Sequence, residues 1–516
     1  MSGDRQPRTL RAALPGPPER RKLGKILPHR NNQHRGLTQT LARNQTDQNL
    51  SFALISSLKE SDTLVTSSPT SWNEAKRRLI PAMVLGTTLE WYDMFLYGSA
   101  SALLFGKLFF PAGDPVTGVA LAFAVFGVGY AARPLGAVVF GHIGDRLGRK
   151  ATLVATLILM GGATTLMGLL PTYAAIGFVA PLLLVILRLL QGMAAGAEYA
   201  GALVMLSEAA PRERRGFFSS IPGIGIYLGI ILSSAAVSAI FLLPEEDLYS
   251  WGWRVPFLIS AVLVVIGIYV RRGISESPVF AAVEEEKAAR KTPIVQVLRT
   301  SKLRLIQAIL LSSGVVLTAP IVLTYSLVYS EQQGTDRAIP LVGTLIGALL
   351  AVLVVPSAGQ LTDKYGRKPV YYVLAIMLAV FPFLFFGLLS TNIAGLVLLA
   401  HALAAPMAWA MTGAQASYLS ELFPSDIRLS GVALARELSG SLLAAPGPLI
   451  ALGLAGMLGG APWLVAGMVA LLAVATIITL KTLPETRGLD LTKTSEERKN
   501  GGEAATYRDH VVSKEG

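Results

Sequence analysis

The 516-residue chain is 52% hydrophobic and only 15% charged, with a mean hydropathy of +0.53. Soluble domains carry roughly a quarter charged residues, so this composition excludes an ordinary soluble domain. The formal net charge of +12 gathers in loops and tails rather than on a continuous surface, which argues against a nucleic-acid-binding protein. The absence of cysteine excludes disulfides and thiolate metal sites.

Residues 1–70 form a basic N-terminal tail. Residues 1–36 hold nine Lys and Arg against two acidic residues, a composition typical of disorder. No apolar core of signal-peptide length is present, so we expect no cleavable leader. A solvated tail, or an upstream misassigned start codon, accounts for this composition. Contact with lipid headgroups is the alternative.

Twelve apolar runs follow between Leu79 and Leu483. A helix that crosses a bilayer needs about 20 mostly apolar residues. We therefore expect an all-α membrane protein with twelve transmembrane helices and both termini on one side. The expected spans are 79–103, 116–140, 151–170, 181–209, 216–243, 255–271, 304–329, 338–358, 369–390, 393–419, 431–457 and 461–482.

Loop charges indicate the orientation. The loops after the even-numbered spans hold clusters of Lys and Arg, whereas the opposite loops hold only Lys107, Arg254 and Arg337 as basic residues. Basic residues are enriched in cytoplasmic loops. The sequence therefore predicts that both termini lie in the cytoplasm.

An internal repeat divides the chain. Gly141-His-Ile-Gly-Asp-Arg-Leu-Gly-Arg-Lys150 recurs 218 residues later as Gly359-Gln-Leu-Thr-Asp-Lys-Tyr-Gly-Arg-Lys368. Ser207-Glu-x-x-Pro-x-x-x-Arg215 recurs 213 residues later as Ser420-Glu-x-x-Pro-x-x-x-Arg428. Two motifs repeated in the same order indicate duplication. We expect six-helix bundles at 71–272 and 304–483, related by pseudo-symmetry, with a cytoplasmic linker at 273–303 and a cytoplasmic tail at 484–516.

The repeated loops are candidates for gating. Asp145 and Asp363 can accept hydrogen bonds from helix N-terminal amides or pair with an arginine of a neighbouring span. Such contacts can form in one conformation and break in another. Topological anchoring by positive charge, the alternative, does not explain two Asp at matching positions. The candidate gating residues are Asp145, Arg146, Arg149, Asp363, Arg367, Glu208, Arg215, Glu421 and Arg428.

Two carboxylates lie within the first expected span. Glu90, Asp93 and Tyr97 share one stripe of a helix. Ionisable residues inside a membrane are costly and are functional candidates by default. Desolvation and like charge favour the protonated form of a carboxylate. Glu90 and Asp93 are therefore candidates for proton coupling, and fixed ion pairing with a neighbouring arginine is the alternative.

Two arginines lie within the second and fourth spans. Arg133 shares a face with Tyr130, and Arg188 shares a stripe with Gln191 and Glu198. A guanidinium offers a planar fork for a carboxylate, and Glu198 is a third proton-relay candidate. In the alternative, the arginines pair with the buried carboxylates. The expected substrate-contact residues are Arg133, Arg188, Tyr97, Tyr130 and Gln191.

Other polar and small residues in the spans have weaker implications. Gly192 and Gly196 allow a close helix approach. We expect His401 to be a hydrogen-bonded structural histidine in wet surroundings, although imidazole can titrate near pH 7. Arg436 and Glu437 are expected near the cytoplasmic end of the eleventh span, as gate pairs.

These motifs resemble a known family. The two Gly-x-x-x-Asp loops resemble the signature of the major facilitator superfamily. Further segments resemble the metabolite:proton symporter family, over about residues 75–488. The resemblance implies the major facilitator fold, a substrate role for Arg133 and a lead for Asp93 in proton coupling. Gly196-Ala-Glu198 stands where the family has Gly-Gly-Glu. The resembling segments are Leu89–Tyr97, Ala132–Gly136, Arg188–Gly192, Gly196–Tyr199, Trp253–Phe257 and Glu276–Pro278.

The family includes permeases for α-ketoglutarate, citrate, shikimate and proline/betaine. The sequence thus favours a transporter that moves a small organic acid with protons by alternating access. Uptake of a zwitterionic osmolyte is the alternative, although residues 489–516 lack the heptads of a coiled-coil tail. A non-transporting membrane sensor is a third possibility, which loss of buried charges would favour.

Motifs for other chemistry are missing. No Walker loop, His-Glu-x-x-His site or Gly-x-Ser-x-Gly elbow occurs, so we expect neither an enzyme nor a cofactor. The expected partners are a small-molecule substrate, protons and lipid, without nucleic acid. We expect a monomer that crosses the cell membrane many times.

Overall fold

The computed structural model describes residues 72–111, 114–147, 149–196, 198–272 and 293–500. Several side chains in these ranges, among them those of residues 141–153 and Glu198, lie outside the description. The expected basic tail, most of the expected linker and residues 501–516 also lie outside it. All regular elements of the described chain are helices.

The first half of the described chain (residues 72–272) follows the expected order of spans. The fourth expected span forms as two helices, α7 and α8, and the fifth as α9 and α10. Helix α10 begins at Pro222, and proline is well accepted in the first turn of a helix. The elements are α2 (Trp72–Leu103), α3 (Phe105–Phe109), α4 (Pro115–Leu147), α5 (Arg149–Leu169), α6 (Tyr173–Ile176), α7 (Val179–Ala195), α8 (Glu198–Ala209), η1 (Arg212–Arg214), α9 (Arg215–Ser220), α10 (Pro222–Ile240), α11 (Glu245–Ser250), η2 (Gly252–Arg254) and α12 (Val255–Arg272).

The second half (residues 293–482) has two π-helical turns, η3 and η4, which interrupt the seventh and eleventh expected spans. Turns of this kind are frequent at functional sites. Its elements, with one helix after it, are α14 (Pro293–Thr300), α15 (Lys302–Pro320), η3 (Ile321–Tyr325), α16 (Ser326–Gln332), α17 (Ala338–Tyr365), α18 (Arg367–Leu389), α19 (Ala394–Glu421), α20 (Arg428–Ser439), η4 (Gly440–Ala444), α21 (Gly447–Met457), α22 (Trp463–Thr482) and α23 (Ser495–Asn500).

Ten helices in the described part of the chain are long and apolar enough to cross a membrane. The other two expected spans correspond to α2 and α5. Helix α2 has 32 residues, but Glu90 and Asp93 lower its hydropathy. The apolar part of α5 that is described, Val154–Leu169, is shorter than a span. The number twelve and the orientation stay predictions.

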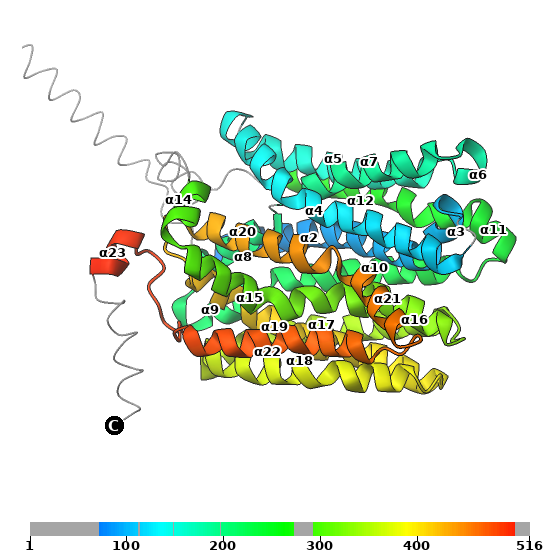
Figure 1. Ribbon diagram of the computed structural model, residues 1–516. Helices are drawn as coiled ribbons and strands as arrows, with labels where there is room; N and C mark the ends of the chain where they lie inside the picture. The colour runs from blue at the N-terminus through cyan, green and yellow to red at the C-terminus, as the bar shows by residue number, and fades with distance from the viewer. Residues whose placement is uncertain (1–71, 112–113, 148, 197, 273–292, 501–516) are drawn as a thin grey trace, which may run out of the picture. The chain divides into compact units, whose positions relative to one another are not determined.

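The long helices run side by side and define two ends. Figure 1 shows α8, α9, α14 and α23 at one end and α3, α6, α11 and α16 at the other. We call the first end the motif end, because the repeated loop of Gly366 and the arginines Arg215 and Arg428 lie there.

Large apolar side chains remain exposed on the outer helix faces. Val265, Leu353 and Ile478 are 66%, 71% and 58% exposed. Such contiguous apolar surface is rare on soluble proteins and suits contact with hydrocarbon.

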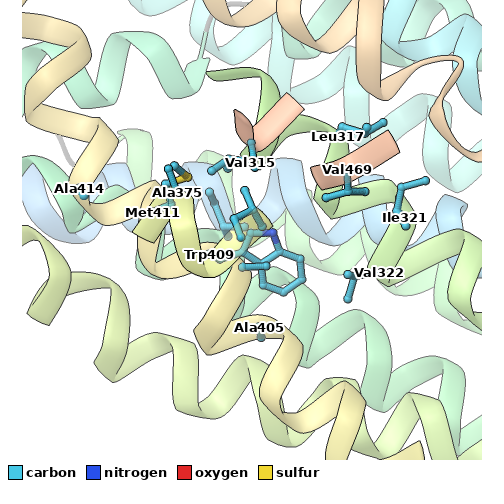
Figure 2. Packing of buried hydrophobic residues seen from close by; sticks show 14 of the residues in the cluster. Val315, Leu317, Ile321, Val322, Ala375, Ala405, Trp409, Met411, Ala414 and Val469 are labelled. Atoms are coloured by element: carbon cyan, nitrogen blue, oxygen red, sulfur yellow. The ribbon is translucent and has the colours of Figure 1, made fainter. Parts of the chain in front are cut away.

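The largest buried cluster joins residues of both halves. Figure 2 shows Trp409 of α19 among Val315, Ile321 and Val322 of α15 and η3. On the first-half side, the ring centroid of Tyr227 lies 5.7 Å from that of Trp409. The two halves therefore share an apolar contact at this place.

The halves are in contact at both ends of the helices. Helix α9 packs against α17 at the motif end, and α2 packs against α16 towards the other end. Gly216 and Gly359 permit the first contact, since a Cβ on either would lie 2.4 or 2.5 Å from the carbonyl oxygen of the other. In this structure the halves therefore touch at both ends.

Candidate functional site

A small cavity lies between α2, α4, α5 and α7. Its volume open to the centre of a water molecule is about 10 Å³, room for roughly one water. The structure thus brings together five of the expected site residues from three helices. The lining residues are Glu90, Asp93, Met94, Gly129, Arg133, Met160, Arg188, Gln191, Gly192 and Ala195.

Glycines bring α4 and α7 together beside this cavity. A Cβ on Gly192 would lie 2.0 Å from the carbonyl oxygen of Gly129, and a Cβ on Gly196 would lie 2.3 Å from that of Arg133. The close approach expected at Gly192 and Gly196 is therefore confirmed. Gly129 also leaves room for Arg188, whose Nε would lie 2.4 Å from an added Cβ.

Arg188 is 1% exposed and has no salt bridge among the described residues. Its guanidinium carbon lies 4.2 Å from the ring centroid of Tyr97, and it donates a hydrogen bond to Gln191. Gln191 in turn donates to the hydroxyl of Thr164 at 2.7 Å. The Nε of Arg188 has no hydrogen-bond partner in the described part of the chain. Pairing with Glu90 or Asp93, the alternative for this arginine, does not occur in the described contacts.

Arg133 has different partners. Its Nη2 lies 3.1 Å from Oε1 of Glu90, and its Nη1 lies 4.0 Å from Oε2 of Glu437. The guanidinium also lies 5.1 Å from the ring centroid of Tyr130. The alternative for this arginine, pairing with a first-span carboxylate, is therefore what the structure contains.

Asp93 is 2% exposed and accepts a hydrogen bond from the Ser260 hydroxyl of α12 at 2.7 Å. No cation lies within 4 Å of its carboxylate among the described side chains. Asp93 and Glu90, three residues apart on α2, therefore differ in their partners: a hydroxyl for the first and an arginine for the second.

The sequence placed Glu437 near the end of a span, but the structure buries it beside the cavity. Glu437 is 8% exposed and lies against Arg133. Its neighbour Arg436 lies 4.3 Å from the ring centroid of Tyr199 and donates to Gln415 at 3.3 Å. The available signal was a charged pair next to an apolar run. The sequence predicted both residues as gate pairs near the cytoplasmic end of the eleventh span, and that role stays a prediction.

The prediction of a hydrogen-bonded structural His401 is confirmed. Its Nδ1 lies 3.0 Å from the carbonyl oxygen of Val397, and its Nε2 lies 3.0 Å from the Ser326 hydroxyl. The wet surroundings expected for it are wrong, because the side chain is fully buried and its ring packs against Phe385.

The loop between α17 and α18 contacts the first half at the motif end. The carboxylate of Asp363 accepts hydrogen bonds from the backbone amides of Gly216 and Phe217, at 2.7 and 2.9 Å. These amides open α9, where a helix favours negative charge. Arg367 also donates to Asp363 at 2.9 Å. Gly366 makes the turn with φ of 99°, which favours glycine.

Arg215 and Arg428 occupy equivalent places in the repeat. The Nε of each donates to the carbonyl oxygen eight residues earlier, at 3.1 and 3.0 Å. Each also pairs with a carboxylate of the opposite half: Arg215 with Glu421 at 3.4 Å, and Arg428 with Glu208 at 2.6 Å. Arg367 joins Glu421 at 3.0 Å. The sequence repeat is thus matched by a repeat of contacts.

Residues 484–498, which we call the C-terminal strap, cross this end. The carbonyl oxygens of Leu489 and Leu491 accept hydrogen bonds from Arg215 and Arg428, at 3.0 and 2.6 Å. Asp490 pairs with Arg212 at 2.8 Å. Hydrogen bonds from the Thr492 amide and hydroxyl, with Arg212 nearby, lower the pKa of Asp490 to about 2. The strap therefore touches both halves.

Four of the residues predicted for gating and proton coupling have no described side-chain position. Asp145, Arg146, Arg149 and Glu198 have side chains outside the described part of the chain.

A family model of the Major Facilitator Superfamily matches residues 83–448. The Inner membrane metabolite transport protein YhjE of Escherichia coli K12 is 35% identical over 421 residues, which are 79% of this chain and 95% of that protein. The Shikimate transporter of the same organism is 39% identical over 370 residues, 70% of this chain and 84% of that protein. The Proline/betaine transporter of Escherichia coli K12 is 33% identical over 381 residues, which are 70% of this chain and 75% of that protein.

A solved structure of a D-xylose-proton symporter is similar in fold. Its TM-score is 0.64 at 22% identity, and the match covers 80% of this chain and 99% of that one. Together with the apolar helices, these similarities show that the chain belongs to the major facilitator superfamily and is a multi-pass transporter of the cell membrane.

Proposed function

We propose that the chain couples proton movement to the symport of a small organic acid with one or two carboxylates. Arg188 carries this proposal. Its guanidinium is buried, lines the cavity and has no carboxylate within 4 Å among the described residues. An uncompensated buried charge is costly. A substrate carboxylate would supply the missing counter-charge through a planar, two-bond contact. Tyr97, Tyr130 and Gln191 would complete the contact surface.

Asp93 is the proposed proton carrier. Its buried carboxylate has a hydroxyl partner and no cation within 4 Å among the described side chains. Charge is expensive in such surroundings, so taking up a proton costs less there than at Glu90, which Arg133 contacts at 3.1 Å. Glu90 and Glu198 are secondary candidates. The similarity to a Shikimate transporter, named for an organic acid, supports the substrate class.

Alternating access follows from the size of the cavity. A space of about 10 Å³ cannot hold an organic acid, so the helices around it must move apart for substrate to enter. The contacts of Asp363, Arg367 and Arg215 at the motif end are the proposed gate, together with Glu208, Glu421 and Arg428. By the repeat, Asp145, Arg146 and Arg149 belong to the same gate.

The proposed topology has twelve spans in two six-helix halves, with the motif end in the cytoplasm. Helix α2 serves as the first span because Glu90 and Asp93 face the interior rather than lipid. The basic residues of the repeated loops favour the cytoplasmic side.

A zwitterionic osmolyte is the second candidate substrate. The similarity to a Proline/betaine transporter supports it, and Glu437 offers a carboxylate for a substrate cation. A non-transporting sensor is disfavoured, because a sensor would have no need of buried charges beside a cavity.

A thermal-shift screen at pH 6 tests the substrate class. Purified protein is heated with organic acids, sugars, amino acids and betaines. We expect an organic acid to raise the unfolding temperature of the wild type, because ligands that bind the folded state stabilise it. Arg188→Gln should lose this shift, whereas Arg337→Gln, at an arginine far along the chain that pairs with Glu331, should keep it. Stabilisation by sugars or quaternary amines alone, or an acid shift that survives Arg188→Gln, would contradict the proposal.

A further inference from the structure

Arg133 lies between carboxylates of both halves. Arg133 belongs to α4 and is 7% exposed, and Glu437 belongs to α20 of the second half and is 8% exposed. Glu90, from the first half, lies at 3.1 Å from one amino group of Arg133, and Glu437 lies at 4.0 Å from the other. One guanidinium therefore joins the halves beside the cavity.

The π-helical turn η4 holds Glu437 in this place. The turn begins three residues after Glu437 and packs against α4. Within it, the Ser441 hydroxyl donates to the carbonyl oxygen of Tyr130 at 2.9 Å. A Cβ on Gly440 would lie 3.3 Å from the ring of Tyr130, the same ring that lies beside Arg133. These contacts hold the segment next to Glu437 against α4, the helix that carries Arg133.

The two carboxylates hold Arg133 in different ways. The Glu90 contact is within hydrogen-bond range, whereas 4.0 Å is beyond it. Glu437 therefore attracts Arg133 by charge alone. The Nε of Arg133 also has no hydrogen-bond partner among the described residues. Another carboxylate can take the place of Glu437 without breaking a hydrogen bond.

We propose that Glu437 is a positioning residue that occupies Arg133 in the empty carrier and is displaced by the carboxylate of the substrate. The inference rests on the proposed function, since it takes the substrate to be an organic anion. Glu437 competes with that anion for one guanidinium, and so it sets the affinity of the site. Charge decides this competition for the Arg133 guanidinium, because a group that displaces Glu437 must itself carry a negative charge.

The same pair also resists opening of the motif end. Glu437 lies nine residues along the chain from Arg428 at that end, roughly 14 Å by helical rise. Separation of the halves there pulls Glu437 away from Arg133. Substrate that takes over Arg133 removes this restraint, which links binding to opening.

Glu437→Gln removes the charge and keeps the size of the side chain, and Glu437→Asp keeps the charge as a matched control. For the acid identified in the screen, we expect Glu437→Gln to bind about tenfold tighter and Glu437→Asp to bind as the wild type does. A folding defect would weaken binding rather than tighten it. Unchanged or weaker binding in Glu437→Gln would overturn the proposal, and weaker binding of a zwitterion would instead assign Glu437 to the cation of the substrate.

A second measurement needs no substrate. The chain has no cysteine, so spin labels can be attached at Glu213→Cys in the first half and Tyr365→Cys in the second, both exposed at the motif end. Pulsed electron paramagnetic resonance on the empty carrier measures the distance between the two labels. Longer distances between the labels should be more populated in Glu437→Gln than in the wild type or Glu437→Asp. An unchanged distribution would overturn the restraint. This result stands even if no organic acid binds, in which case the proposed function fails separately.

Discussion

At the scale of single residues, the two cavity arginines show what spacing can and cannot predict. Helical periodicity predicted that both Arg133 and Arg188 lie inside their spans, and both side chains are buried. Their partners depend on tertiary contacts that no local pattern encodes. Arg133 meets Glu90 and Glu437, whereas Arg188 meets the ring of Tyr97 and the amide of Gln191. Depth was predictable from the sequence, and pairing was not.

Asp93→Asn should abolish substrate accumulation driven by a proton gradient while leaving exchange intact. The reason is that Asn cannot take up and release a proton, yet its amide oxygen can still accept the hydrogen bond from Ser260. Proteoliposomes with an alkaline lumen measure accumulation, and counterflow at equal pH measures exchange. Glu90→Gln is the matched comparison on the same helix. Proton-driven accumulation that persists in both variants would remove α2 from the coupling mechanism.

At the scale of elements, the ends of the apolar runs were predicted better than their interruptions. The breaks at η3 and η4 lie inside apolar runs, where hydropathy carries no signal for a π-helical turn. The C-terminal strap was expected to be part of a cytoplasmic tail. Its contacts with Arg215 and Arg428 use the backbone carbonyls of Leu489 and Leu491, and a sequence pattern does not specify carbonyl contacts between distant segments.

Asp363→Asn should slow transport more than it weakens binding. The carboxylate of Asp363 accepts hydrogen bonds from the N-terminal amides of α9 and pairs with Arg367. Loss of its negative charge therefore destabilises the form closed at the motif end. In counterflow assays we expect the maximal rate to fall about tenfold and KM to change less than about twofold. Asp336→Asn, before α17 at the other end, is the control. An unchanged exchange rate in Asp363→Asn would leave the repeated loops as topological anchors only.

The strap contact through Asp490 does not respond to pH in the physiological range. Its pKa is about 2 in the folded chain and 3.8 for an ordinary aspartate. A folded pKa below the unfolded value contributes stability above pH 3.8, and that stability is lost as the pH falls through 2. Between pH 8 and 6 the carboxylate stays ionised. A pH effect on transport in this window must therefore come from another group.

At the scale of the whole molecule, the two halves touch at both ends, and the cavity between the charged groups has room for about one water. The sequence predicted the helices and the repeat that build this arrangement. It could not predict which conformation the structure holds, because the populations depend on small differences between contacts such as those of Glu437, Asp363 and Arg428.

Substrate binding should tighten as the pH falls from 8 to 6. An anion that enters beside Glu90 and Asp93 adds negative charge to a space that already holds two carboxylates, and protonation of Asp93 removes that excess. It also leaves an arginine freer to bind the carboxylate of the substrate. Proton and anion then favour each other by the same coupling free energy. With one proton taken up per substrate, Kd can fall by up to about tenfold per pH unit, which calorimetric titration at pH 8, 7 and 6 measures. Asp93→Asn should bind with an affinity that no longer follows pH. Affinity independent of pH in the wild type, or weaker at pH 6, would show that proton and substrate do not meet at this site.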